Sequence, residues 1–254
     1  MAKEGLSNIE KELRFRKWCS NKKIKRFLLD LDDTISLTGE VFSLKKSQCA
    51  NYLAEYYSQL NSHQWLVLLN EYNNKYFESC GVNPNIWTGI ISEIGKQYSL
   101  SRQVCQSAEE IIMGIYYTPL SFTPGAEKCL GFLKRADIQF GIVTHANIPW
   151  TDRKYQWLRL DRFIPRDAIY VIDENGHKTP ERWREAIRYF NIKLNNCAVV
   201  GDSPRSDINP ALENGVSHCF LVGDGNGWSI HNHEIKSPVN RISQLDNLID
   251  AFIN

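Results

Sequence analysis

The chain has 254 residues and a net charge of +1, and 43% of its residues are hydrophobic and 11% aromatic. This content is ample for a packed interior, and the near-neutral charge gives no electrostatic reason to expect a nucleic-acid or membrane partner. No apolar stretch approaches the length of a transmembrane helix, and residues 1–8 lack the apolar core of a signal peptide. The sequence therefore predicts a soluble globular protein, with the cytoplasm as its default location.

The cysteines and histidines follow no familiar metal or disulfide pattern. The seven cysteines are scattered singly, and no two of them form a C-x-x-C pair. This argues against a disulfide framework and against a zinc site. His231 and His233 are close in sequence, but their surroundings are rich in Asn and Gly. We interpret that stretch as a surface loop and expect reduced thiols.

The first segment predicted to be helical covers residues 7–18. Ser7 and Glu10 form an S-x-x-E capping box, and Ile9 and Leu13 recur at helical spacing. We therefore expect this helix to pack against the core.

The segment from residue 11 to residue 26 is heavily basic. It could be a surface for an anionic partner. We favour a solvated face, because the run is short and contains no recognisable nucleic-acid module.

A cluster of acidic residues follows the first predicted strand. The apolar run at 24–29 predicts a buried strand, and Asp30, Asp32 and Asp33 come directly after it. Such residues can converge at the carboxyl edge of a sheet, where open α/β folds bind their ligands. Carboxylates this close repel one another unless a cation, a proton or hydrogen bonds compensate. The alternative is a turn that uses Asp for local hydrogen bonds, with Thr34 as a helix cap, and this segment alone leaves both open.

The pattern changes after this cluster. Residues 36–42, with Gly39 at their centre, predict a small hairpin near the acidic edge. Residues 43–118 carry helical spacing, interrupted by breakers such as Gly81 and Pro84, and predict an all-helical insert. Its helices are expected over 44–60, 63–77, 86–98 and 104–117. We interpret their apolar stripes as the core of the insert itself rather than a ligand site.

Helices and strands alternate in the second half of the chain. Helices are expected over 126–135, 151–160, 180–190 and 206–214, and strands over 139–144, 168–172, 197–201 and 218–222. The tail from 242 to 253 predicts a closing helix. Alternation of this kind implies right-handed crossovers and a parallel sheet, which the strand at 24–29 would join. The predicted fold class is therefore α/β, with helices on both faces of the sheet and an all-helical insert.

Polar residues stand at three further strand ends. Thr144 and His145 end the strand at 139–144, Lys178 follows the next strand, and Asp202 follows the strand at 197–201 with Asp207 five residues on. Singly, Thr144 can be a helix cap, Lys178 a solvated lysine and Asp202 a turn residue. Together they place a threonine, a lysine and several aspartates along one edge of the sheet. That inventory can hold a phosphoryl group and a divalent cation.

These motifs resemble those of the haloacid dehalogenase-like (HAD) superfamily of phosphohydrolases, subfamily I with a helical C1 cap. D-L-D-D-T at 30–34 matches the first motif, I-V-T at 142–144 the second, Lys178 the third and G-D-S-P-R-S-D at 201–207 the fourth. They occur in the order and spacing of the family.

The resemblance also implies a domain organisation. It covers residues 24–35 and 123–222 and implies a Rossmann-like core. The expected core comprises 24–42 and 119–254, the C1 cap comprises 43–118, and 1–23 form an N-terminal helical extension. In the family, such a cap closes over the site and selects the substrate.

The resemblance implies a phosphohydrolase that cleaves a small phosphomonoester through an aspartyl-phosphate. Asp30 would be the nucleophile, and Asp32 the general acid and then the general base. Thr144 would hydrogen-bond the phosphoryl oxygens, and Lys178 would offset the negative charge. Lys154 is the alternative to Lys178, although it lies inside the helix after Thr144.

The implied cofactor is Mg²⁺. Asp30, the backbone carbonyl of Asp32 and Asp202 would hold it, with Asp207 nearby or bridged by water. His145 could contact phosphate or substrate, although a loop histidine is more often a structural hydrogen-bonder.

Two alternatives stay open. The acid/base Asp32 favours phosphate-ester chemistry over dehalogenation, because a halide leaves without protonation. Phosphomutases of the same fold share the aspartate pair. A catalytically silent relative could instead bind an anion such as RNA through its basic N-terminal segment, although a nucleic-acid partner is not the expectation.

Overall fold

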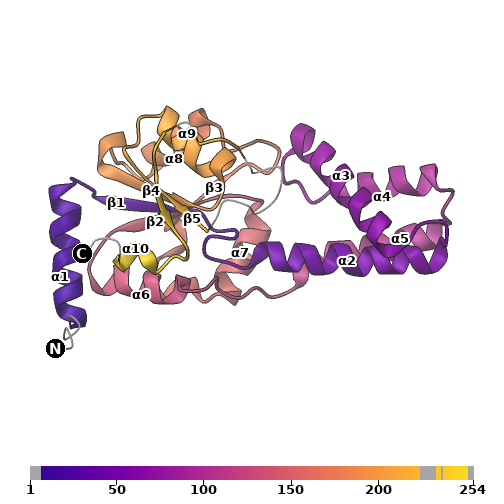
Figure 1. Ribbon diagram of the computed structural model, residues 1–254, viewed down its shortest axis with the longest axis horizontal. Coiled ribbons are helices and arrows are strands. Elements are labelled where there is room, and N and C mark those ends of the chain that lie inside the picture. The colour runs from indigo at the N-terminus through magenta and orange to yellow at the C-terminus, as the bar shows by residue number, and fades with distance from the viewer. Residues whose placement is uncertain (1–6, 224–232, 236, 251–254) are drawn as a thin grey trace.

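The protein consists of an α/β core with a helical region on one side of it (Figure 1), as seen in a computed structural model that describes residues 7–223, 233–235 and 237–250. His231 lies outside the described residues, and His233 is exposed. All seven cysteines are free thiols, as expected. Among the residues described, no helix combines the length and the apolarity needed to cross a bilayer.

The core is built on a six-stranded sheet with the order β3-β2-β1-β4-β5-β6, in which every neighbouring pair is parallel. The strands are β1 (Arg26–Leu29), β2 (Phe140–His145), β3 (Ile169–Ile172), β4 (Cys197–Gly201), β5 (His218–Val222) and β6 (Asn240–Ile242). The predicted α/β fold class with a Rossmann-like parallel sheet is confirmed. The short strand β6 is an addition to the predicted set.

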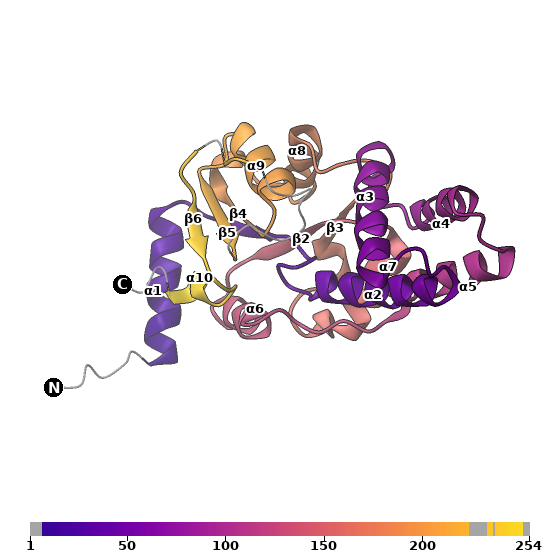
Figure 2. The same ribbon diagram turned by 45° about the vertical axis from the view of Figure 1, so that its right-hand side comes forward.

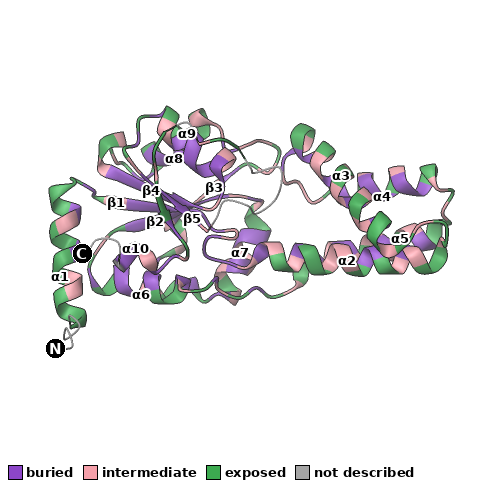
Figure 3. Ribbon diagram, in the orientation of Figure 1, coloured by how far each residue is buried: buried purple, intermediate pink, exposed green. Residues whose placement is uncertain are grey.

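Helices cover both faces of this sheet because its strands are apolar on both sides (Figure 3). Along β1 the side chains alternate, so Phe27 and Leu29 enter one hydrophobic cluster and Leu28 enters the other. The first face is covered by α1 (Asn8–Asn21), α6 (Ala126–Arg135) and α10 (Asn247–Asp250), and the second by α8 (Pro180–Tyr189) and α9 (Asn209–Glu213).

Helix α1 begins as predicted but buries a different face. The capping box of Ser7 with the next turn is present. The helix packs against the core, as predicted, but Ile9 and Leu13 are 70% and 58% exposed, whereas Phe15 and Cys19 are buried. Six residues separate Ile9 from Phe15, a rotation of about 240° around the helix axis. The ring of Phe15 faces that of Phe27 at 5.8 Å, and this contact selects the buried face.

The insert is helical, as predicted, and has its own hydrophobic cluster. It contains α2 (Thr38–Tyr56), α3 (Ser62–Cys80), α4 (Ile86–Gln97) and α5 (Arg102–Met113), followed by a 3-10 turn at Gly114–Tyr117. We call these four helices the cap helices. Helix α3 runs back towards the core (Figures 1 and 2), so its last turns lie beside the carboxyl edge of the sheet.

The hairpin expected at 36–42 is absent, because α2 already begins at Thr38. Only isolated bridges of Ser36 to Asp32 and to Phe122 remain. The carboxylate of Asp33 accepts the backbone N–H of Gly39 at 2.7 Å and so satisfies a free donor in the first turn of α2. Gly39, which predicted a turn, therefore lies in the first turn of a helix.

Two further segments differ from the predictions. Helix α7 covers Ile148–Trp157 rather than 151–160, because Asn147 caps it. The helix expected at 206–214 is a π-helical turn, Pro204–Ile208, followed by α9. Both differences bring polar residues to the site described next.

Candidate active site

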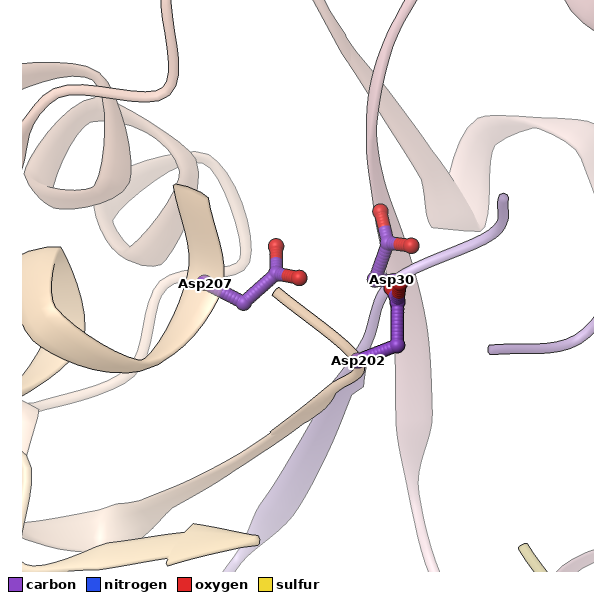
Figure 4. Close-up of side chains that lie close together, drawn as sticks. All are labelled: Asp30, Asp202 and Asp207. Atoms are coloured by element: carbon purple, nitrogen blue, oxygen red, sulfur yellow. The ribbon is translucent and has the colours of Figure 1, made fainter. Parts of the chain in front are cut away.

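The acidic site is built where neighbouring parallel strands end together. Asp30 follows β1 and Asp202 follows β4, and these strands pair in register with Leu29 opposite Val200. The backbone N–H of Asp30 continues the ladder by donating to the carbonyl of Val200 at 2.9 Å. Asp207 comes from the π-helical turn after β4. One carboxylate oxygen from each of the three aspartates lies within 4.8 Å of the others (Figure 4).

Lys178 links two of these carboxylates. Its ammonium donates to Asp30 and, at 2.7 Å, to Oδ1 of Asp207, and the side chain is buried. Burial alone would lower its pKa, but Asp207 and Asp30 raise the pKa of Lys178 above its ordinary value. The ammonium therefore stays charged between them.

The cluster still holds more negative than positive charge. Burial is the main cause that raises the pKa of Asp30 to about 8, against the opposing effect of Lys178. Burial and the nearby carboxylates of Asp30 and Asp207 also raise the pKa of Asp202. Three carboxylates and one ammonium sum to a charge of −2 when all are ionised, which one divalent cation balances. Oxygen donors at this spacing suit Mg²⁺. The side chain of Asp32 is outside this group.

Asp32 instead has a lysine of its own. Oδ1 of Asp32 accepts from Lys154 at 2.5 Å and from the hydroxyl of Thr38, and Oδ2 lies 3.4 Å from Oγ1 of Thr144. Lys154 is fully buried, and its ammonium lies 3.3 Å from the ring centre of Trp150. Burial would raise the pKa of Asp32, but Lys154 and then Thr38 hold it below the usual value.

The two lysines that the sequence offered as alternatives are thus both present, Lys178 on Asp30 and Lys154 on Asp32. Sequence reasoning did not find the contacts of Lys154 and Thr38 with Asp32. The one signal in the sequence that could have predicted a buried Lys154 was the presence of a lysine near the apolar positions of a short helix. Asp33 shapes the turn, with φ of 59° and its bond to Gly39.

Thr144 and His145 end β2 but face different surroundings. Thr144 is fully buried behind Asp32 and is not among the residues that line the cavity described below. His145 does line the cavity, and its Nε2 is buried without a hydrogen-bond partner among the residues described. Burial, with a smaller effect from Lys178, lowers the pKa of His145 to about 3. His145 is therefore a neutral group at the site.

A cavity of about 100 Å³ lies between the acidic edge and the cap helices. Its core side is the aspartate cluster with Lys178. On the side of α3 and α4 it is largely apolar, since Phe77 and Ile86 line it together with one polar residue, Asn73. Phe42, Tyr116 and Trp150 complete an aromatic wall.

Hydrogen bonds join the helical insert to the core beside this cavity. The carboxylate of Glu78, near the end of α3, accepts from both terminal nitrogens of Arg205 at 2.5 and 2.8 Å. Val82 N–H donates to the carbonyl of Glu174 at 2.8 Å, and its neighbour Asn83 bonds the side chain of Asn175 at 2.7 Å.

Comparisons with known proteins agree with this geometry. The chain is 24% identical over 207 residues to a glyceraldehyde 3-phosphate phosphatase of Pyrococcus furiosus, covering 77% of this chain and 79% of that protein. A haloacid dehalogenase-like hydrolase of Xanthomonas campestris superposes with a TM-score of 0.71 at 15% identity, covering 90% of both chains. A putative beta-phosphoglucomutase of Thermotoga maritima superposes with a TM-score of 0.61 at 13% identity, covering 90% of this chain and 98% of that one. A family model described as haloacid dehalogenase-like hydrolase matches residues 24–215. The chain therefore belongs to the haloacid dehalogenase-like hydrolase family.

Proposed function

We propose that the protein is a magnesium-dependent phosphohydrolase that cleaves a small phosphomonoester through an aspartyl-phosphate on Asp30. The observation that carries the proposal is the position of Asp30. It lines a small cavity at a strand end, bonded to Lys178 and within 4.8 Å of two further carboxylates. The phosphatase named for the Pyrococcus relative supports a substrate of this size class.

In the first half-reaction, a carboxylate oxygen of Asp30 forms a bond to phosphorus, and the bond from phosphorus to the ester oxygen breaks. The leaving oxygen takes a proton from Asp32 and departs as the alcohol. Lys154 favours ionised Asp32 in the free protein. An arriving phosphoryl dianion is a like charge and favours the protonated form.

In the second half-reaction, Asp32 accepts a proton from water, and the water oxygen attacks phosphorus. The bond between phosphorus and Asp30 breaks, which releases orthophosphate and restores the carboxylate. The hydroxyl of Thr38 and the ammonium of Lys154 keep the carboxylate of Asp32 oriented in both steps.

Charge is the main obstacle to the first step, because an anion attacks a dianion. Two unit charges about 4 Å apart repel by about 4 kcal/mol at an effective dielectric constant near 20. Lys178 offsets part of this repulsion. Bound Mg²⁺, held by Asp30, Asp202 and Asp207 with the backbone carbonyl of Asp32, would supply further positive charge to the phosphoryl oxygens.

The test is release of orthophosphate from a panel of phosphomonoesters with and without Mg²⁺. We expect magnesium-dependent turnover that Asp30→Asn abolishes. Asp137→Asn is the matched control, because Asp137 is an exposed aspartate before β2, at the opposite edge of the sheet. Absence of turnover on every ester would contradict the proposal. Isomerisation of a sugar phosphate without release of orthophosphate would instead identify a mutase, and salt-dependent RNA binding without turnover would identify the silent alternative.

A further inference from the structure

Among the residues of α3 and α4 that line the cavity, Asn73 is the one polar side chain, and it makes no hydrogen bond with a described residue. Asn73, on α3, is 4% exposed and lines the cavity among apolar residues. No described residue forms a hydrogen bond with its amide. A polar side chain in an apolar wall that makes no hydrogen bond within the protein is satisfied by water or by a ligand that enters the cavity. We therefore expect a bound substrate to supply the hydrogen-bond partner that the amide of Asn73 lacks.

The charges around the cavity restrict what that substrate can be. Among the described residues that line it, Lys178 is the sole lysine or arginine, and it already bonds Asp30 and Asp207. Five aspartates also line it. No cation is left for a second phosphate or for a carboxylate on the leaving group. Transfer of such an anion from water into an apolar-walled site without a counter-charge is strongly unfavourable.

The remaining polar atoms of the wall are neutral. Nε1 of Trp150 and Nε2 of His145 are buried without partners among the residues described. The Asn73 amide offers a donor and an acceptor, which matches a hydroxyl or a carbonyl oxygen. Phe77 and Ile86, beside Asn73 on the cap side, suit a short carbon skeleton.

We propose that Asn73 is the specificity-determining residue of the cap. It would hydrogen-bond an uncharged oxygen of the leaving group, so that the protein prefers phosphate esters of small polyols or hydroxyaldehydes. Esters whose leaving group carries a carboxylate or a second phosphate would be poor substrates. This inference rests on the proposed phosphohydrolase function and adds the substrate class to it.

The experiment compares kcat/KM for three esters of nearly equal size in the presence of Mg²⁺. Glycerol 3-phosphate carries two hydroxyls, 3-phosphoglycerate carries one hydroxyl and a carboxylate, and propyl phosphate carries neither group. The expected order is glycerol 3-phosphate first and 3-phosphoglycerate last. Asn73→Ala should lower kcat/KM for glycerol 3-phosphate by about 5- to 150-fold and leave propyl phosphate nearly unchanged.

Two further variants separate recognition from folding. Asn73→Leu keeps the side-chain volume while removing the amide, and we expect it to repeat the selective loss. Asn74→Ala changes the neighbouring asparagine of α3, which does not line the cavity, and should leave the order of esters unchanged.

The outcomes distinguish this inference from the function on which it rests. If 3-phosphoglycerate is the best ester, or if both Asn73 variants lower all three values equally, the assignment of Asn73 is wrong while the phosphohydrolase proposal stands. If the native protein cleaves no ester, both proposals are wrong.

Discussion

The ion pair between Lys154 and Asp32 gives a quantitative test of how the site is held together. The ammonium of Lys154 is fully buried, whereas the side chain of Asp32 is 27% exposed. Removing one member of a buried pair leaves an uncompensated charge and costs about 3–5 kcal/mol of unfolding free energy. We expect this loss for Asp32→Asn, because Lys154 would keep its charge in a fully buried position.

The reverse change should cost less. In Lys154→Met, Asp32 keeps the hydroxyls of Thr38 and Thr144 and its contact with solvent, so we expect a loss of about 1–3 kcal/mol. Replacing both members of a buried pair by uncharged residues is often neutral. The double variant should therefore be more stable than Asp32→Asn alone, which requires a coupling energy larger than the loss of about 1–3 kcal/mol expected for Lys154→Met.

Urea unfolding followed by tryptophan fluorescence, without Mg²⁺, measures these differences. The matched control is the pair of Lys75 and Glu93 on the cap helices, whose side chains are 69% and 41% exposed. Their coupling should stay below about 1 kcal/mol. Additive losses for Lys154 and Asp32 would refute the assignment of a stabilising buried pair. The stability measurement is also needed to interpret activity, because a loss of activity in Asp32→Asn indicates a catalytic role only when the variant is still folded.

Three further predictions concern the metal, a buried histidine and the contact between cap and core. Mg²⁺ at about 100 times its dissociation constant should stabilise the native protein by about 2.7 kcal/mol, and calorimetry should show this effect lost in Asp202→Asn. The pKa of His145 is lowered to about 3 in the folded protein, against about 6.5 in the unfolded chain. Between these two pH values the unfolded chain binds more protons than the folded protein, so the free energy of unfolding falls as the pH falls. Between pH 7.5 and pH 5, the free energy of unfolding of His145→Gln should therefore fall by about 2 kcal/mol less than that of the native protein. The control His63→Gln, at an exposed histidine, should behave as the native protein does. Glu78→Gln weakens the contact with Arg205, in which Glu78 is 56% exposed, and should raise KM by up to about fivefold with a smaller change in kcat; an unchanged KM would show that this contact does not hold the cap closed.

The sheet could be predicted from sequence because its information is local and periodic. Alternating helices and apolar strands leave few topologies, and the predicted bounds of α6, β4 and β5 agree with the structure residue for residue. Strand β6 could not be found in this way. It has three residues, two of them exposed, and so lacks the apolar pattern on which strand prediction depends.

The start of α2 and the buried face of α1 depended on contacts that no local pattern contains. Gly39 is a turn residue in most contexts, but here Asp33 satisfies its N–H and a helix can begin. In α1, Ile9 and Leu13 fit helical spacing as well as Phe15 does. The aromatic contacts of Phe15 with Phe27 and Phe132 in the folded chain make the choice.

The same difference between local patterns and contacts made only in the folded chain applies to the site. Asp30 and Asp202 could be placed together because parallel strands end at one edge. The partner of Asp32 could not, because it depends on where α7 begins. With Asn147 as its cap, α7 starts at Ile148, and Lys154 then reaches Asp32 beneath the ring of Trp150. Asn73 carried no signal at all, because an asparagine on a helix is ordinary until its surroundings are known.

The turn at 204–208 contacts both the cap helices and the acidic cluster. Arg205 binds Glu78 of the cap, Ser206 lines the cavity, and Asp207 bonds Lys178 within the carboxylate group. The carbonyl of Ser206 also accepts from the buried indole of Trp183, which fixes the turn to α8. The cap helices therefore contact the same short segment that supplies one of the carboxylates. A substrate that satisfies the cap side of the cavity would by this route also favour the arrangement of charges that its phosphoryl group requires.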